Sequence, residues 1–217
     1  MKTQNNKWLN GIAALSLASV GTLALILAFP SSIGTGQAQS AVQQPSAKVT
    51  AKVSNRTLIG PVRAENGTSA DSGWVTILCN NIKTANLKDL FITAALEVGI
   101  ETETQSPPNS EAKGFIEVRV LRDGQEVEPG VIAYGKREQE LDVADTATVE
   151  LGLETLEAAS FSFVDVDVPV GVHQICVQAR VRAKTEGADV EAVGAVGKGT
   201  VTVESVRLIK GEDVLLD

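Results

Sequence analysis

The stretch that decides the fold is Leu90–Ile100, which reads LFITAALEVGI. Its even-numbered positions are all apolar, whereas its odd-numbered positions include Thr93, Glu97 and Gly99. Successive side chains of a β-strand point to opposite faces of a sheet, so this period of two places one face on a core and the other in water. The stretch therefore predicts a long strand that is buried on one side.

The same alternation recurs along most of the chain. In His173–Ala183 the apolar residues stand at every second position. Shorter runs with this period occupy residues 74–81, 115–121, 130–134, 148–153, 160–168 and 200–209. Residues 142–157 are the best candidate for a helix, but the alternation of Val149, Leu151 and Leu153 favours a strand there as well.

Turn residues separate these runs. The sequence Arg122-Asp123-Gly124-Gln125 predicts a hairpin turn, because glycine adopts positive φ without strain and aspartate bonds its own backbone. Strands that recur between such turns, without long helical stretches, predict an all-β fold. The expected architecture is an antiparallel β-sandwich, immunoglobulin-like or jelly-roll-like, that follows an N-terminal signal segment.

The first residues predict export. Lys2 and Lys7 supply a basic start, and Gly11–Phe29 is a run of 19 uncharged residues. Gly36-Gln37-Ala38 then provides small residues for cleavage, so residues 1–38 are predicted to be a signal peptide. An uncleaved membrane anchor is the alternative, because the apolar run approaches the roughly 20 residues that span a bilayer.

The rest of the chain is expected to form one domain. Residues 39–58 are predicted to be a linker and a possible first strand, and residues 59–217 a single β-sandwich domain. The mature protein is then expected outside the cytoplasm, as a secreted, periplasmic or cell-surface protein.

Composition excludes several classes of function. The 217 residues include one His and two Cys, too few for a zinc site built from several Cys and His ligands. The formal net charge of -8 argues against nucleic acid as a partner, because binding to phosphates requires a basic surface. An acidic exterior suits solubility outside the cell, but it identifies no partner.

Cys79 and Cys176 both lie in predicted strands. Outside the cytoplasm such a pair predicts a disulfide, and two unpaired buried thiols are the alternative. The spacing suggests the bridge between the two sheets of an immunoglobulin domain. Two details argue against that bridge: Cys176 shares its strand face with Gln174 and Gln178, and Gln174 stands where a tyrosine is expected.

Few residues could carry chemistry. His173 is the only histidine, and it is interpreted as a surface or strand-edge residue because no G-x-S-x-G motif presents a nucleophile. Asp165 and Asp167 could contribute to a Ca²⁺ site, which needs about six to eight oxygen ligands, and a solvated acidic face is the alternative. Trp74 and Tyr134 are the candidates for contact with a ligand such as a sugar.

Two further patterns mark surface positions. Asn55 and Asn66 begin N-x-[ST] patterns and are candidate glycosylation sites. The glycine-rich stretch Gly194–Thr200 matches a phosphate loop only in part, because a strand pattern follows it in place of a helix. We therefore expect this stretch to be a flexible hairpin loop.

These observations favour an exported β-sandwich protein of the cell surface or the secreted space, with a structural or interaction role and without catalysis. An extracellular ligand-binding module for carbohydrate or Ca²⁺ is the main alternative, and a secreted hydrolase is a further one. No cofactor is expected apart from a possible Ca²⁺. Nucleic acid is not expected as a partner, and a membrane is expected only if the N-terminal segment stays uncleaved.

The segment Ala47–Val53 predicts a strand, and the sequence leaves two possible partners for it. Ala and Val alternate there with Lys and Thr, just after the linker. Such a strand can pair with the edge of its own sheet or with a sheet edge of a neighbouring copy, which would produce self-assembly. Lys48 and Lys52 favour an ordinary first strand or a loose tail, because charge on an edge discourages pairing between molecules.

Overall fold

A computed structural model describes residues 48–106, 109–142 and 148–208. The predicted signal peptide, residues 1–38, and the linker residues 39–47 lie outside the described residues. Within the described part of the chain, no helix is long and apolar enough to cross a membrane.

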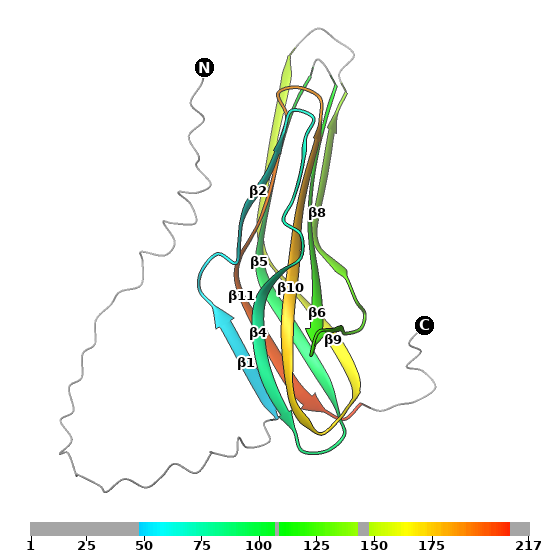
Figure 1. The fold of residues 1–217 in the computed structure, drawn as a ribbon. Helices are drawn as coiled ribbons and strands as arrows, with labels where there is room; N and C mark the ends of the chain where they lie inside the picture. Colours follow the sequence, from blue (N-terminus) through cyan, green and yellow to red (C-terminus); the bar gives the residue numbers. More distant parts are fainter. Residues whose placement is uncertain (1–47, 107–108, 143–147, 209–217) are drawn as a thin grey trace, which may run out of the picture. The chain divides into compact units, whose positions relative to one another are not determined.

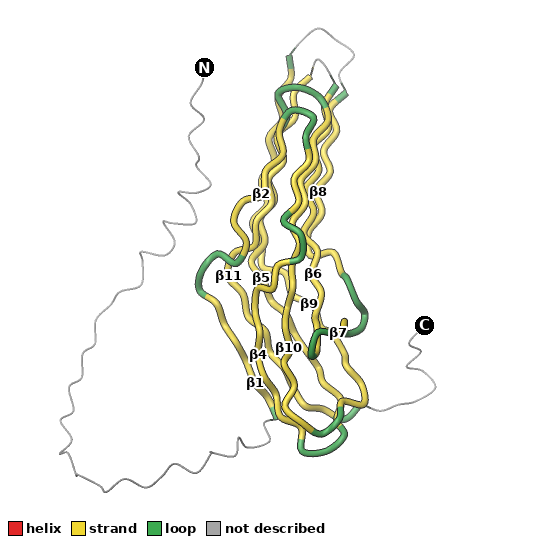
Figure 2. The backbone as a smooth tube through the Cα atoms, viewed as in Figure 1, coloured by secondary structure: helices red, strands yellow, loops and turns green. Residues whose placement is uncertain are grey.

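The described residues form two antiparallel sheets packed against each other (Figure 1), with loops between the strands (Figure 2). Sheet A contains β1 (Val49–Ser54), β2 (Ile59–Glu65), β5 (Lys88–Ser106), β9 (Val149–Val168) and β11 (Glu191–Val206). Sheet B contains β3 (Ser69–Asp71), β4 (Val75–Thr84), β6 (Ser110–Arg122), β7 (Gln125–Glu126), β8 (Ile132–Leu141) and β10 (Gly171–Glu186). The predicted all-β sandwich is confirmed.

The pairing of the strands fixes which of them lie at the edges. In sheet A the order is β1, β11, β5, β9, and β2 pairs with β11 on the same side as β1. In sheet B, β10 and β6 are central; β3 and β4 flank β10, and β7 and β8 flank β6. The last strand of sheet A, β9, therefore has a long edge beyond its pairing with β5.

The core lies between the inner faces of the two sheets, and the alternation predicted it. In β5 the even-numbered residues of Leu90–Ile100 are at most 5% exposed. In β10 the buried residues are Ile175, Val177, Ala179, Val181 and Ala183. Each of these strands thus buries one face and turns the other toward solvent, as an amphipathic strand in a sandwich must.

The predicted loop at Gly194–Thr200 is wrong, because these residues lie inside β11. Glycine serves close packing between the sheets there: a Cβ atom at Gly194 would lie 2.6 Å from Cγ1 of Val181 in β10. The register between β11 and β5 also shifts between Val196 and Gly199, which marks a bulge. Glycine here is a strand residue chosen for its lack of a side chain.

Other local predictions agree with the structure or become more specific. Asp123 and Gly124 both have positive φ, 49° and 88°, and they connect β6 to β7 as the hairpin turn requires. The two runs predicted at residues 148–153 and 160–168 belong to one continuous strand, β9. The helical alternative for residues 142–157 is excluded for the part that β9 contains.

A test of the close packing compares two strand glycines. We expect Gly194→Ala to lower the free energy of unfolding by about 1–3 kcal/mol, because the new methyl group would overlap the buried Val181 side chain. Gly60→Ala is the matched control: a Cβ atom there meets nothing within 4 Å, and alanine stiffens the unfolded chain. Denaturant unfolding of both variants measures the difference, and equal stabilities would contradict the packing role.

Candidate functional site

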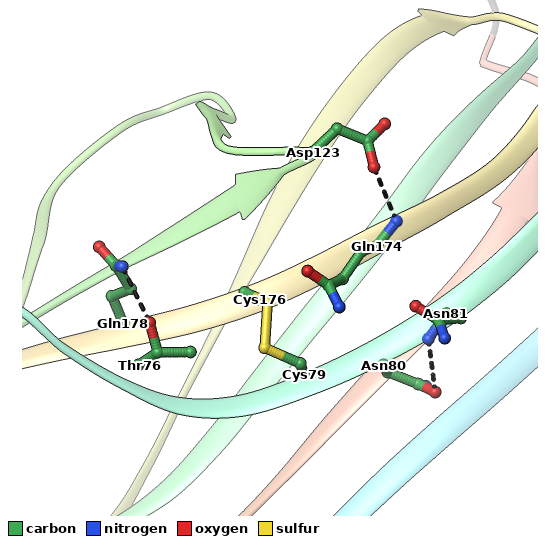
Figure 3. Close-up of a disulfide and its surroundings, with 8 residues drawn as sticks. All are labelled: Thr76, Cys79, Asn80, Asn81, Asp123, Gln174, Cys176 and Gln178. Carbon is green, nitrogen blue, oxygen red and sulfur yellow. Dashed lines mark hydrogen bonds between the residues drawn. A yellow bond between two sulfur atoms is a disulfide. The ribbon is translucent and has the colours of Figure 1, made fainter.

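The predicted disulfide between Cys79 and Cys176 is present. The two residues are direct partners on neighbouring strands, β4 and β10, with their Cα atoms 4.1 Å apart (Figure 3). The bridge therefore lies within sheet B, whereas the immunoglobulin bridge joins two sheets. A disulfide points to an oxidising, extracytoplasmic environment.

The surroundings of the disulfide are polar, as the neighbours of Cys176 predicted. Gln178 donates a hydrogen bond from Nε2 to Oγ1 of Thr76 at 3.0 Å, and the Gln174 backbone N–H donates to Oδ1 of Asp123 at 2.8 Å (Figure 3). The bridge thus lies on the outer face of sheet B and fastens the edge strand β4 to the central strand β10.

His173 is buried at the end of the sandwich, and both of its ring nitrogens have partners. Nδ1 lies 2.8 Å from Oδ2 of Asp123, and Nε2 lies 2.9 Å from the carbonyl oxygen of Pro169. Both ring nitrogens thus face oxygen atoms of the protein's own fold. The arrangement ties the β6–β7 turn to the β9–β10 turn. Of the interpretation as a surface or strand-edge residue, the surface position is wrong, because the ring is buried near the start of β10.

Asp165 and Asp167 have different partners in the structure. Asp165 pairs with Arg122 at 3.2 Å, and burial raises the pKa of its carboxyl group. Asp167 has a φ of 55° near a bulge of β9, and its backbone N–H donates to Oδ1 of Asp89 at 3.0 Å. Among the described residues, no group of three or more His, Cys, Asp or Glu is arranged to hold a metal ion.

A pocket of about 330 Å³ adjoins Asp167, at the end of sheet A. Asp89 and Asp167 line it together with Lys88 and Arg207, so its charges are mixed. None of its described lining residues is aromatic, which leaves a sugar ring without a stacking surface there.

The two candidate ligand-contact residues lie on opposite faces of sheet B. The guanidinium group of Arg119 stacks 4.3 Å from the ring centroid of Trp74 on the outer face. Tyr134 is 8% exposed and donates a hydrogen bond from its hydroxyl to the Ala94 carbonyl at 2.5 Å, and burial raises its pKa to about 12. Tyr134 is therefore a core residue, and the prediction that it contacts a ligand is wrong.

Both candidate glycosylation residues are exposed. Asn55 lies between β1 and β2, and Asn66 lies in the turn after β2 with a φ of 48°. Their positions leave room for a glycan, and glycosylation stays a prediction.

A ladder of carboxylates crosses the outer face of sheet A, which the sequence analysis did not identify. Cross-strand partners share a face, and the register pairs Glu65 with Glu191, Glu191 with Glu103, and Glu101 with Glu154. We call this set the acidic ladder; its members are Glu65, Glu101, Glu103, Glu150, Glu154 and Glu191. Arg63 pairs with Glu191 at 2.8 Å and with Glu65 at 3.3 Å. These ion pairs lie at the side of the ladder formed by β2 and β11.

Crowding and burial change the titration of this ladder. Burial raises the pKa of Glu101, with a further contribution from the charge of Glu154. Burial also raises the pKa of Glu103, to which Glu150 adds both a carboxyl–carboxyl hydrogen bond and its charge. The pKa of Glu191 is raised for the same principal reason. Two of the neighbours that oppose ionisation, Glu150 and Glu154, belong to the edge strand β9.

The inner face of β9 carries a row of exposed apolar side chains. Its register with β5 places Val149, Leu151 and Leu153 opposite Ser106, Thr104 and Thr102, whose side chains point into the sandwich. The three apolar side chains are nevertheless 39–43% exposed, because β8 of sheet B packs mainly beneath β5. Sheet A thus extends past sheet B at this edge.

Side chains of β8 cross this gap at only a few points. Gln139 donates from Nε2 to the Leu151 carbonyl at 2.7 Å, and Arg137 donates to Oγ1 of Thr155. Between β8 and β9 a pocket of about 180 Å³ reaches the core residues Val98 and Ile100. The long edge of β9, its exposed inner face and this opening form the candidate interaction surface.

β1 forms the opposite edge of sheet A and pairs with β11. The more polar face of β1 is turned toward the interior. Thr50 and Lys52 are opposite the buried Val203 and Val201 of β11, so they face the interior side. The apolar residues point outward, and the side chains of Val49 and Val53 are 54% and 65% exposed. The predicted first strand is therefore present, but its orientation reverses the usual rule that the apolar face is buried.

Comparisons with known proteins leave the chain without an assigned family. No family model and no curated protein matches it. Among solved structures, it is similar to "Structure of infectious bursal disease virus Gx strain", with 12% identity over 84% of this chain and a TM-score of 0.18. It is similar also to "Structure of infectious bursal disease virus Gt strain", with 11% identity over 94% and a TM-score of 0.21. The chain spans 50% and 59% of the length of these two viral chains.

Removal of the disulfide tests its contribution to stability. The bridge joins residues 97 positions apart, so it removes a large loop entropy from the unfolded chain. We expect Cys176→Ser to lower the free energy of unfolding by roughly 2–5 kcal/mol. The double variant Cys79→Ser with Cys176→Ser controls for the unpaired thiol. Two thiols that titrate in the unfolded, unreduced protein would contradict the bridge.

The acidic ladder predicts that the protein is more stable in mild acid than at pH 7. The folded-state pKa values of Glu101, Glu103 and Glu191 lie above the ordinary 4.5, so the folded state binds these protons more tightly than the unfolded state. Stability should therefore rise as pH falls from 7 through those raised values. Below about pH 4 it should fall again, because Asp71 binds a proton in the unfolded state, whereas Arg180 lowers its pKa to about 2 in the folded state.

Thermal melting between pH 7 and pH 3 measures this dependence. Glu103→Gln should reduce the rise toward mild acid, since it removes one of the raised groups. Glu186→Gln is the control, because the pKa of Glu186 is lowered by Lys184 and the residue lies outside the ladder. A melting temperature that falls steadily from pH 7 downward would contradict the prediction.

Proposed function

We propose that the chain is an exported β-sandwich protein of the cell surface or the secreted space, with a structural or interaction role and without catalysis. The observation that carries the proposal is the Cys79–Cys176 disulfide, which suits an oxidising compartment. The signal-like residues 1–38 support the same location.

The use of the polar side chains supports a structural role. His173 bonds two turns together, Asp165 pairs with Arg122, and the Tyr134 hydroxyl bonds a core carbonyl. Each of these candidates for chemistry thus has a partner within the fold. The inner face of β9 carries the exposed apolar residues Val149, Leu151 and Leu153 in a row, which has the form of a contact surface for an extended chain.

The location can be tested on the protein from its native source. We expect it in the extracytoplasmic fraction, with an N-terminus at Gln39 and without free thiols, because the signal is removed and the cysteines are bridged. N-terminal sequencing and thiol titration provide both readouts. A cytoplasmic chain that begins at Met1 and carries two free thiols would overturn the proposed function, and a membrane-bound chain with an intact N-terminus would replace the secreted form by an anchored one.

A further inference from the structure

We propose that β1 of one copy adds to the free edge of β9 in a second copy, as a further antiparallel strand of that copy's sheet A. The inference deepens the proposed function and rests on it, since strand addition between copies is a structural role outside the cell. The segment that pairs with the edge of β9 is Lys48–Val53 of another copy.

The donor strand, β1, turns its apolar face to solvent in its own sheet. Val49 and Val53 are more than half exposed, while Lys52 faces the interior side. Among the described residues, the side-chain hydrogen bond of β1 to another strand is the one that Thr50 accepts from Asn80 at 2.9 Å. Release of β1 therefore costs its backbone pairing with β11 and uncovers the edge of β11, but the apolar side chains of β1 itself lose little burial.

The acceptor edge has backbone groups that point outward. The Val164 N–H of β9 donates to the Glu128 carbonyl, which lies beyond this edge. In an antiparallel pair alternate residues turn their N–H and C=O groups to the same side, and no register shift interrupts β9 between Val149 and Asp165. Glu150, Gly152 and Glu154 consequently direct their backbone groups toward the same edge, where no strand of the described residues is paired with them.

One register satisfies both faces of the added strand at once. On the outer face, Lys48 is opposite Glu154, Thr50 opposite Gly152, and Lys52 opposite Glu150. On the inner face the same register places Val49 opposite Leu153, Ala51 opposite Leu151, and Val53 opposite Val149. The spacing of the two lysines equals that of the two glutamates, so both ion pairs and all three apolar pairs form together.

Charge complementarity supports this match. Glu150 and Glu154 belong to the acidic ladder, in which one arginine, Arg63, approaches Glu65 and Glu191 at the far side. Two lysines at the β9 edge would relieve the repulsion that Glu150 and Glu154 exert on Glu103 and Glu101. The same lysines would discourage β1 from pairing with an edge that lacks acids.

The orientation of β1 opposes an antiparallel contact between intact edges. If β1 remained paired with β11 while its free edge met β9 of another copy, Val49 and Val53 would continue the outer face beside the glutamates. Lys52 would then lie on the inner face beside Leu151. In an antiparallel pair with β9, β1 brings its apolar residues to the apolar face when it leaves its own sheet and turns over.

Chain length excludes insertion of β1 into its own copy. From Val53, the last residue of the added segment, to Ile59 of β2 the chain spans at most about 22 Å. Val53 would lie level with Ser106 of β5, whereas Ile59 lies level with Val98, so the connection would also have to run about 26 Å along the strands. A strand added beyond β9 lies four inter-strand spacings from β2, about 19 Å, across β11, β5 and β9. The donor and acceptor must therefore belong to different copies, and because they lie at opposite edges of sheet A, each copy can both give and receive a strand.

Cysteine pairs test the register on the mature chain, residues 39–217. A mixture of a Thr50→Cys copy and a Gly152→Cys copy should form an intermolecular disulfide, because the register places these residues opposite each other. A side chain at Gly152 meets nothing within 4 Å, so the acceptor variant should fold normally. Mixing Thr50→Cys with Glu154→Cys is the shifted control. Equal or preferential cross-linking in the shifted mixture would overturn the register.

Charge reversal tests the driving interaction, with sedimentation velocity as the readout and melting temperature as the check of folding. The wild-type mature chain should form concentration-dependent oligomers that weaken with salt. Lys48→Glu with Lys52→Glu, or Glu150→Lys with Glu154→Lys, should weaken association by roughly tenfold or more, and a mixture of the two variants should restore it. Lys184→Glu with Glu186→Lys, an exposed pair on β10, is the matched control and should change nothing.

The remaining outcomes separate the two proposals. A wild-type chain that stays monomeric at high concentration would overturn strand addition and leave the proposed function standing. Loss of oligomers on deletion of residues 39–47, with β1 intact, would overturn β1 as the occupant. A cytoplasmic location would instead overturn the proposed function, whatever the purified chain does in solution.

Discussion

The packing of β5 and β11 of sheet A against β6 and β10 of sheet B is the interaction on which the rest of the structure depends. These four strands bury the apolar positions of the two-residue period, and glycine at position 194 lets the sheets approach closely. The strands outside this contact are placed by their pairing with it. As a result, β1 and β9 contribute less to the core and keep faces and edges open to other contacts.

The elements that sequence could predict are those with a local signal. The alternation in Leu90–Ile100 and His173–Ala183 gave the central strands, and Asp123-Gly124 gave a turn, because each pattern lies within a few neighbouring residues. Gly194–Thr200 misled the prediction, since glycine marks a loop and a close sheet contact equally well. The position of Val181 on the facing strand decides between a loop and a close contact of the sheets, and the sequence does not give that position.

The candidate surface required knowledge of which strands are neighbours. Glu65 and Glu191 are distant in sequence but direct partners in sheet A, so the acidic ladder has no local pattern. The alternation of Val149, Leu151 and Leu153 correctly indicated one apolar face, but it could not show that β8 leaves this face uncovered. Tyr134 was misassigned for the same reason, since the acceptor of its hydroxyl, Ala94, lies on the other sheet.

The position of the disulfide also has a mechanical consequence. The chain between Cys79 and Cys176 contains all of β5 to β9, and the covalent bridge joins its two ends. Tension applied to the two termini would travel across the sulfur atoms, so the intervening segment, roughly 300 Å of contour at about 3.3 Å per residue, would be spared from extension. Forced unfolding could lengthen only the outer parts of the molecule, and the segment from β5 to β9 would remain a closed covalent loop under load until the bridge was reduced.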